Sequence, residues 1–560
     1  MNIKNYCNAS FFIAFGMVVF VSCAKLDTKI YSAIPTDQYW QTNAQIAAGI
    51  APAYTQLGST IGMNGPATQM EEFPSDEILA PTRGNDWGDA GHWDALWKHT
   101  YEPTNSNWNS GWNAIFTGIA NCNQILRSVN ALNPAPSALT SINAELHALR
   151  AYYYYLAIDI FGRVPIITDT TTSLTPPNAS RAAVYNFIVS DLKAALPNLT
   201  STVSASSYGR MNKYVAFTLL AKLYLNAQVY TGTPGNSYTP GTPDWANCMS
   251  YCDSVIAGPY SLSSIYYDNF APTNGPSVKE NIFCVPADHT NNRVNSWENA
   301  ILHYQSYQAF GMSSGSNLWN GFCSAANFYS TFDTTSTYSI SGANTLRTFN
   351  DSRSGQFLIG QQFKGTYNYP PNQNIVTTGP ITSYITDAGT GAYLAFNPNM
   401  TLFSDPSNAG RLAGVRNIKY FPSSTSGQLS SDMDNDIVVF RLADVLLMKA
   451  EALLRSGGNT STALALVNQV RTRAYGNSNY NWSLSDLTLV NILKERGREL
   501  AYEGFRSQDL IRYEVAGNGA YFTGARVPQK SADANQHWMI FPIPSLQITA
   551  NSSLTQNPGY

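Results

Sequence analysis

Apolar residues recur at helical spacing in the first half of the chain. One stripe covers residues 142–160 and another covers 216–227. Apolar positions three and four residues apart share one face of a helix, so both stripes predict amphipathic helices. The first stripe stops at Gly162, as helices commonly do at a glycine. Residues 113–129 and 182–196 have the pattern expected of partner helices.

The same spacing returns near the C-terminus. Stripes cover 442–453 and 463–470, with Gly457 and Gly458 at the turn between them, and a further helix is expected near 492–500. Paired helices of this length, with small residues interleaved, resemble tetratricopeptide-type hairpins stacked side by side. The pattern therefore predicts a mainly α fold of stacked helix hairpins.

A long middle segment, 262–435, has no sustained helical period. It is rich in Ser, Thr, Asn, Gly and Pro, with short apolar runs such as Ile282–Val285. This composition favours a loop-rich insert with short strands, packed on the helical scaffold. Because binding sites commonly lie on loops held by a rigid frame, we expect this insert to face the ligand. The predicted regions are thus helical 23–261, the insert, and helical 436–560.

The N-terminus has the features of an export signal. Lys4 is the only charge before the apolar run Phe11–Val21, and Ser22 and Cys23 follow directly. A run of about eleven residues suits a signal peptide but is shorter than the roughly 20 that span a bilayer. Residues 1–22 are therefore predicted to be removed, and Cys23 resembles the acylated cysteine of a bacterial lipobox. Ordinary cleavage nearby, with an incidental cysteine, is the alternative. Ala24 favours delivery to the outer membrane, by analogy with lipoprotein sorting.

The charge content is low for a folded protein. The 560 residues carry a net charge of −3, and only 12% are charged, against about 25% in ordinary soluble domains. A protein without a basic face lacks the electrostatic footprint for nucleic acid or for an anionic membrane surface. Surfaces of amides and hydroxyls suit neutral, hydroxyl-rich ligands. The alternative explanation of the low charge content is a composition common among exported proteins.

Five groups of motif residues occur in order along the chain. They lie at residues 145–155 leading into 161–165, at 220–226, at 440–444 with 449–452, at 495–496 with 506–509, and at 541–544 with 556–560. Together they resemble the SusD/RagB family of nutrient-binding outer-membrane lipoproteins of Bacteroidetes, and the resemblance covers nearly the whole chain after residue 22.

The resemblance implies a function as well as a fold. It implies a helical repeat scaffold, binding of an oligosaccharide or polysaccharide, and pairing with a SusC-like, TonB-dependent β-barrel that imports the captured ligand. It also implies a lipid-anchored position on the outer membrane, facing the exterior, with no catalysis and no cofactor.

Aromatic residues are the candidates for ligand contact. An indole ring can bury the C–H face of a sugar, while nearby amides and charges orient its hydroxyls. For each tryptophan, packing in the core is the alternative, above all for Trp108 and Trp112. Alignment with the family's binding loop and aromatic platform implies ligand contacts at Arg83, Asn85, Asp86, Trp87 and Trp319. The clustering of tryptophans after residue 83 and their presence in the polar insert add Trp93 and Trp297 as predicted ligand-binding residues.

Other motifs favour structural roles. The acids and arginines of 495–506 alternate at helical spacings of three and four, which indicates ion pairs between helices. Gly311–Gly315 fits the hydrolase pattern G-x-S-x-G but lacks the strand and helix that this motif needs. Residues 432–436 resemble the start of a calcium loop, yet Ile437 and Ala443 occupy positions that an EF-hand reserves for Gly and Glu. The histidines are too dispersed for a zinc site, so we expect no metal.

We therefore predict an outer-membrane lipoprotein that captures a glycan and passes it to a TonB-dependent transporter. The alternative from a different class is a lipoprotein that only docks the transporter, for peptide or other non-sugar cargo. A surface glycoside hydrolase is the third possibility.

Overall fold

The computed structural model describes residues 40–341, 344–365, 369–371, 373–378, 383–423 and 433–560. The predicted signal peptide and Cys23 lie outside these residues, so the lipid anchor stays a prediction. Among the described helices, we find none whose length and apolar character suffice for a membrane crossing.

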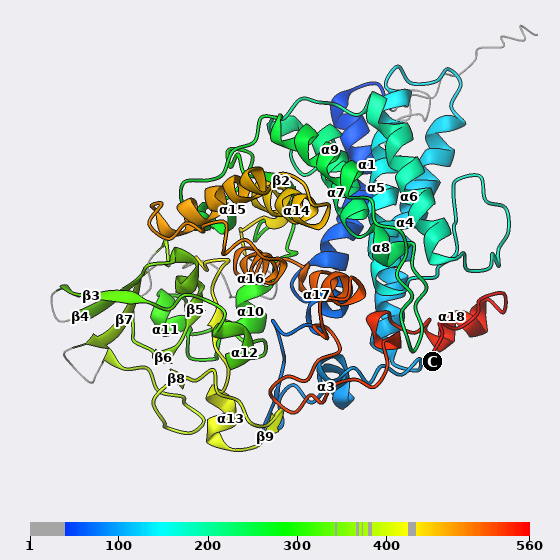
Figure 1. Ribbon diagram of the computed structural model, residues 1–560. Helices are drawn as coiled ribbons and strands as arrows, with labels where there is room; N and C mark the ends of the chain where they lie inside the picture. The colour runs from blue at the N-terminus through cyan, green and yellow to red at the C-terminus, as the bar shows by residue number, and fades with distance from the viewer. Residues whose placement is uncertain (1–39, 342–343, 366–368, 372, 379–382, 424–432) are drawn as a thin grey trace, which may run out of the picture.

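The described chain has a first group of helices before the insert and a second group after it (Figure 1). The first group is α1 (Asn43–Ile61), α2 (Pro66–Glu72), α3 (His92–Lys98), α4 (Ser106–Asn130), α5 (Leu139–Ile160), α6 (Arg181–Ala195), α7 (Lys213–Leu225), α8 (Ala227–Tyr230) and α9 (Trp245–Ile256). The second group is α14 (Leu442–Arg455), α15 (Thr460–Tyr475), α16 (Leu489–Glu499), α17 (Arg506–Val515) and α18 (Ser545–Ala550).

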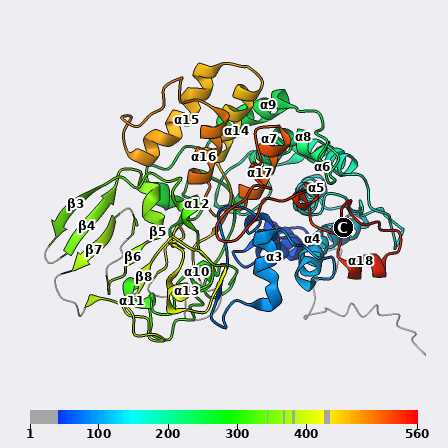
Figure 2. The same cartoon turned by 60° about the horizontal axis from the view of Figure 1, so that its bottom comes forward.

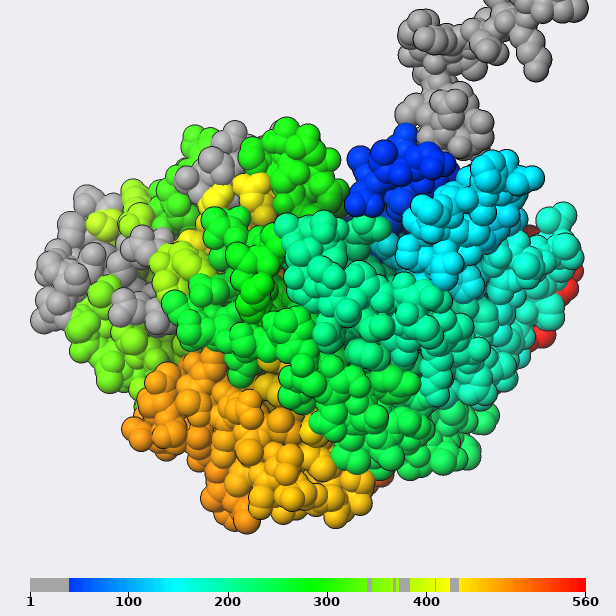
Figure 3. Space-filling model, turned by 90° about the horizontal axis from the view of Figure 1, so that it is seen from above, coloured from blue at the N-terminus to red at the C-terminus, as the bar shows by residue number. Residues whose placement is uncertain are grey.

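The helices pack in a continuous series. Helix α1 lies against α4, α4 against α5, α5 against α6, and α7 against α9. Helix α9 in turn contacts α14, which packs on α15 and α16, so the two groups form one array. Figure 3 shows residues of the first group (cyan to green) and of the second group (orange) side by side on one face of the molecule. The prediction of a mainly α fold of stacked hairpins is confirmed.

Local sequence signals set the ends of these helices. The Ser180 hydroxyl accepts a hydrogen bond from the backbone N–H of Ala183 at the start of α6, over 3.2 Å, and so satisfies an otherwise unpaired donor. Helix α5 ends two residues before Gly162, whose φ of 69° lies in the left-handed region that favours glycine. Apolar periodicity thus located the helices, and capping residues define their limits.

The insert consists of short helices, short strands and loops, as predicted (Figure 2). Its helices are α10 (Trp297–Ile301), α11 (Tyr307–Phe310), α12 (Ala326–Tyr329) and α13 (Asn408–Leu412). Its strands are β2 (Asn281–Val285), β3 (Ser336–Ser341), β4 (Asn344–Phe349), β5 (Phe357–Leu358), β6 (Gly360–Gln361), β7 (Gln373–Thr378), β8 (Ala395–Phe396), β9 (Ser404–Asp405) and β10 (Arg416–Asn417).

Two strand pairs join the insert to the helical array. Strand β2 pairs antiparallel with β11 (Ile437–Arg441), which leads directly into α14. Strand β1 (Thr82–Arg83) pairs in parallel with β9, so that Arg83 lies opposite Asp405. The second pair places the segment after β1 against the insert, although the two are more than 300 residues apart in sequence.

Buried ion pairs hold the C-terminal helices against the insert. Arg441 contacts Glu280 at 2.9 Å and Glu499 at 2.5 Å, and all three side chains are inaccessible to solvent. Arg353, from the insert, contacts both Glu495 and Glu499 at 2.9 Å. The structural interpretation of the 495–506 charge cluster is therefore confirmed.

We predict that Glu499→Gln lowers the free energy of unfolding by about 3–5 kcal/mol, because removing one member of a buried ionic cluster leaves its partners uncompensated. Burial raises the pKa of Glu499, but the surrounding guanidinium groups, first that of Arg473, outweigh burial and lower the pKa to about 2. A depressed carboxyl pKa stabilises the fold above the unfolded value and loses that effect as pH falls toward 2.

Chemical denaturation of both proteins at neutral pH and between pH 4.5 and 2 measures this effect. The difference in stability between wild type and Glu499→Gln should shrink as the pH falls through that window. A loss below about 1 kcal/mol at neutral pH, the value of an exposed ion pair, would contradict the buried role of Glu499.

Candidate ligand-binding site

The segment after β1 forms a tightly bent loop. Five of the eight residues from Gly84 to Gly91 have φ between 35° and 82°, and three of these, Trp87, Asp89 and Ala90, are not glycine. Such residues occur in the left-handed region only where surrounding contacts hold them. The loop is therefore a fixed feature of the surface.

Trp87 is held in this loop by contacts with the insert. Its Nε1–H donates to the backbone carbonyl of Trp319 over 2.8 Å. The ring centroids of Trp87 and Trp319 are 6.5 Å apart, with the planes inclined at 46°. Both indoles are partly exposed while packing on the core. Two tryptophans from distant segments thus form a pair at the surface.

Tyr304 extends this aromatic surface. Its hydroxyl donates to the exposed carboxylate of Asp86, and the Arg411 guanidinium lies 5.6 Å from its ring centroid. Burial and the hydrogen bond to Asp86 raise the pKa of Tyr304, so the phenol remains a donor. We call Trp87, Tyr304 and Trp319 the aromatic platform. Sequence reasoning missed Tyr304 because it considered tryptophans alone as platform residues.

Charges beside the platform are internally paired. Arg411 Nε donates to Asp387 over 2.9 Å, and the backbone N–H of Gly389 donates to the same carboxylate over 3.1 Å. Burial opposes ionisation of Asp387, but the hydrogen bond from Arg411 prevails and lowers its pKa. Burial and the charge of Arg416 lower the pKa of His303 to about 3, so this imidazole is neutral. The site therefore offers polar groups with little net charge.

Arg83 lies beneath the platform, where its guanidinium donates hydrogen bonds to backbone carbonyls. Its side chain is only 1% exposed. Nη1 donates to the carbonyls of Gly410 and Ala413 over 2.6 and 2.8 Å, and Nη2 contacts Cys323 Sγ at 3.2 Å. The guanidinium therefore has no surface to present to a sugar, and the prediction that Arg83 contacts ligand is corrected on grounds of burial.

Trp93 is also interior, at 5% exposure. Its Nε1–H donates to Asp89 over 2.5 Å, and its ring centroid lies 5.5 Å from that of Trp87. It supports the platform from below instead of contacting ligand. Of the predicted loop residues, Asn85, Asp86 and Trp87 remain accessible at the site.

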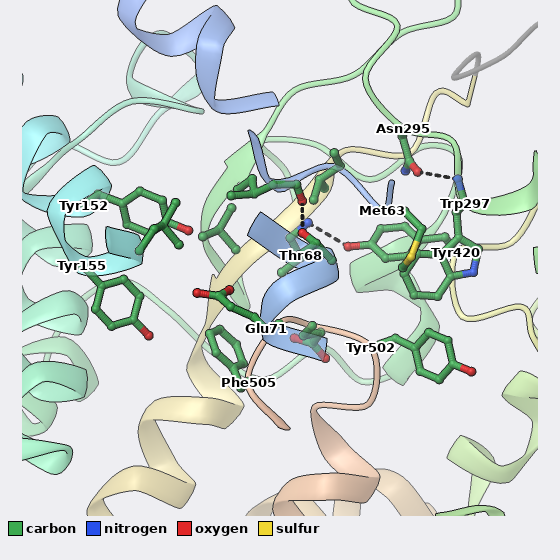
Figure 4. Close-up of a pocket in the computed structure, with 17 residues that line it drawn as sticks. Met63, Thr68, Glu71, Tyr152, Tyr155, Asn295, Trp297, Tyr420, Tyr502 and Phe505 are labelled. Atoms are coloured by element: carbon green, nitrogen blue, oxygen red, sulfur yellow. Dashed lines mark hydrogen bonds between the residues drawn. The ribbon is translucent and has the colours of Figure 1, made fainter. Parts of the chain in front are cut away.

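Trp297 lines a cavity together with Met63, Tyr420 and Tyr502 (Figure 4). It is 3% exposed, and its Nε1–H donates to the carbonyl of Asn417 over 3.0 Å. Its ring packs on Tyr420 with centroids 4.5 Å apart. This buried position makes Trp297 a core residue and corrects its assignment as a ligand contact. Trp108 and Trp112 are buried in α4, as the core alternative predicted.

The other motifs have structural roles in the described residues. Ser313, in the hydrolase-like motif, follows α11 in an exposed turn without a preceding strand. Asp434 accepts from the backbone N–H of His289, and Asp436 accepts from that of Ala287. Asp432 lies outside the described residues. Within the described ranges, no group of three or more His, Cys, Asp or Glu side chains could hold a metal ion.

Two protein-family models and a known relative match this chain. Residues 279–560 match the model of the SusD family, and residues 26–225 match a model described as "Starch-binding associating with outer membrane". The starch-binding protein SusD of Bacteroides thetaiotaomicron is 24% identical over 432 residues, covering 74% of this chain and 72% of that protein.

Two solved structures share the fold. A laminarin-binding SusD-like protein has a TM-score of 0.65 at 22% identity, covering 93% of this chain and 100% of its own. Surface glycan-binding protein A from Bacteroides uniformis has a TM-score of 0.68 at 19% identity, covering 92% of this chain and 99% of its own.

We predict that Arg83→Ala lowers the free energy of unfolding by at least about 2 kcal/mol, because it leaves buried carbonyls without donors. Asn85→Ala, at an exposed position in the same loop, should change it by less than about 0.5 kcal/mol. Thermal and urea denaturation of the two variants measure the difference. Equal stability of the two variants would contradict the structural role assigned to Arg83.

Proposed function

Because the chain belongs to the SusD family, we propose that it binds a glycan through the aromatic platform and performs no chemistry on it. The observation that carries this proposal is the partly exposed pair of indoles, Trp87 and Trp319, joined by a hydrogen bond from one ring to the backbone of the other. Rings held at a fixed mutual angle bind a sugar with little loss of side-chain entropy.

The chemistry around the platform suits a neutral, hydroxyl-rich ligand. Aromatic faces bury the C–H side of a pyranose ring. Asn85 contributes an exposed amide, and the Asp86 carboxylate has acceptor capacity beyond its bond to Tyr304. Paired charges beside the rings avoid the desolvation cost of an isolated ion. The names of the relatives, which refer to starch, laminarin and surface glycans, support the same ligand class.

We further propose that the protein works at the outer membrane beside a TonB-dependent, SusC-like barrel. Acylated Cys23 would anchor it there, facing the exterior, and the captured oligosaccharide would pass to the barrel. The matched family description, with its association to the outer membrane, supports this location. Co-purification of a barrel protein together with silence on a glycan array would instead favour the alternative of non-sugar cargo.

Trp87→Ala and Trp319→Ala should each weaken binding of laminarin or soluble starch at least about tenfold, or ~1.4 kcal/mol, because each removes one face of the platform. Isothermal titration and affinity electrophoresis measure the change. Trp482→Ala removes a partly buried indole elsewhere and serves as the matched control, with unchanged affinity expected. Wild-type affinity in both platform variants, with wild-type binding established, would remove the platform from the proposal.

Cys23→Ser should abolish incorporation of a clickable fatty acid and release the protein from the membrane fraction, because the hydroxyl replaces the acylated thiol. Cys7→Ser, within the predicted signal peptide, should retain the label. Labelling of the Cys23→Ser protein at wild-type level would contradict the anchor assignment.

A further inference from the structure

Gly321 lies directly against the indole of Trp87. A Cβ placed on Gly321 would lie 2.2 Å from Cζ2, 2.5 Å from Cε2 and 2.6 Å from Cη2 of that ring. Ordinary van der Waals contact for a Cβ begins near 3.4 Å. No side chain larger than hydrogen therefore fits at Gly321 while Trp87 keeps its position.

The backbone conformation does not explain this glycine. Gly321 is absent from the glycines with positive φ, so other residues could adopt its conformation. Its N–H donates to the carbonyl of Ala300 over 2.9 Å, and the next N–H, of Phe322, donates to the same oxygen over 2.9 Å. These bonds hold the backbone in place. A side chain at Gly321 would be accommodated by movement of the indole.

Trp87 has little freedom to move without losing its own contacts. Outward displacement would lengthen the 2.8 Å hydrogen bond from Nε1 to the Trp319 carbonyl. It would also separate the ring from Phe322, whose centroid lies 5.2 Å away. The mutual angle of the two platform indoles thus depends on the close approach of one ring to residue 321.

We propose that Gly321 is a positioning residue of the glycan site, which sets the place and tilt of the Trp87 indole without touching the ligand. This inference rests on the proposed glycan-binding function. It predicts that the identity of residue 321 controls affinity through Trp87 alone.

A double-mutant cycle with laminarin and soluble starch as probes tests this. Gly321→Ala should weaken binding about tenfold, comparably to Trp87→Ala, and should cause no further loss in the Trp87→Ala background. The matched control is Gly49→Ala in α1, where the added Cβ would lie 2.3 Å from the Trp40 indole, away from the platform. This control should lower the melting temperature and leave affinity unchanged.

If Gly321→Ala alone does not fold, adding Trp87→Ala should restore folding, because it removes the group that the methyl strikes. Wild-type affinity in Gly321→Ala would overturn the inference. The inference would also be overturned if Gly321→Ala weakened binding as much in the Trp87→Ala background as in wild type, or if Trp87→Ala failed to restore folding. Absence of binding by wild type to either probe would instead count against the proposed function, while recovery of stability in the double variant would still report the steric contact.

Discussion

The structure depends on ion pairs buried between the insert and the C-terminal helices. Arg353 and Glu280 come from the insert, whereas Glu499 comes from α16, and their contacts are shielded from water. Charges removed from water require nearly complete pairing, since one missing partner leaves an uncompensated ion. The cluster therefore forms only when both regions are in their final places, and it fixes the loop-rich insert on the helical array.

A buried arginine also holds the site in place, with backbone carbonyls as acceptors in place of carboxylates. Arg83 bonds carbonyls near residues 410–413, which places β1 against the insert. The loop that follows turns back to bring Trp87 over Gly321 and beside Trp319. Because the aromatic platform is assembled from segments more than 200 residues apart, its geometry follows from the buried clamp beneath it. Rigidity at the surface is thus a consequence of polar contacts in the interior.

Sequence reasoning located the helices because burial imposes a period that apolar residues must follow. The stripe over 142–160 became α5, and that over 463–470 became part of α15. It could not separate surface indoles from interior ones, because both are equally apolar: Trp87 is partly exposed, whereas Trp297 is a core residue. The role of Tyr304 depends on a hydrogen bond to Asp86, 218 residues away, and no local pattern carries such information.

The burial of arginines and acids changes how the low charge content of the chain is interpreted. A composition typical of exported proteins would by itself leave the few charges on the surface, where hydration is most favourable. Here Glu495, Arg496 and Glu499 are at most 1% exposed, so part of the 12% of residues that are charged lies in interior ion pairs and not on the surface. Asn, Ser, Thr and Tyr must then supply its polarity. Such a surface can bind a neutral glycan without the cost of dehydrating ions. The buried charges hold the platform rigid.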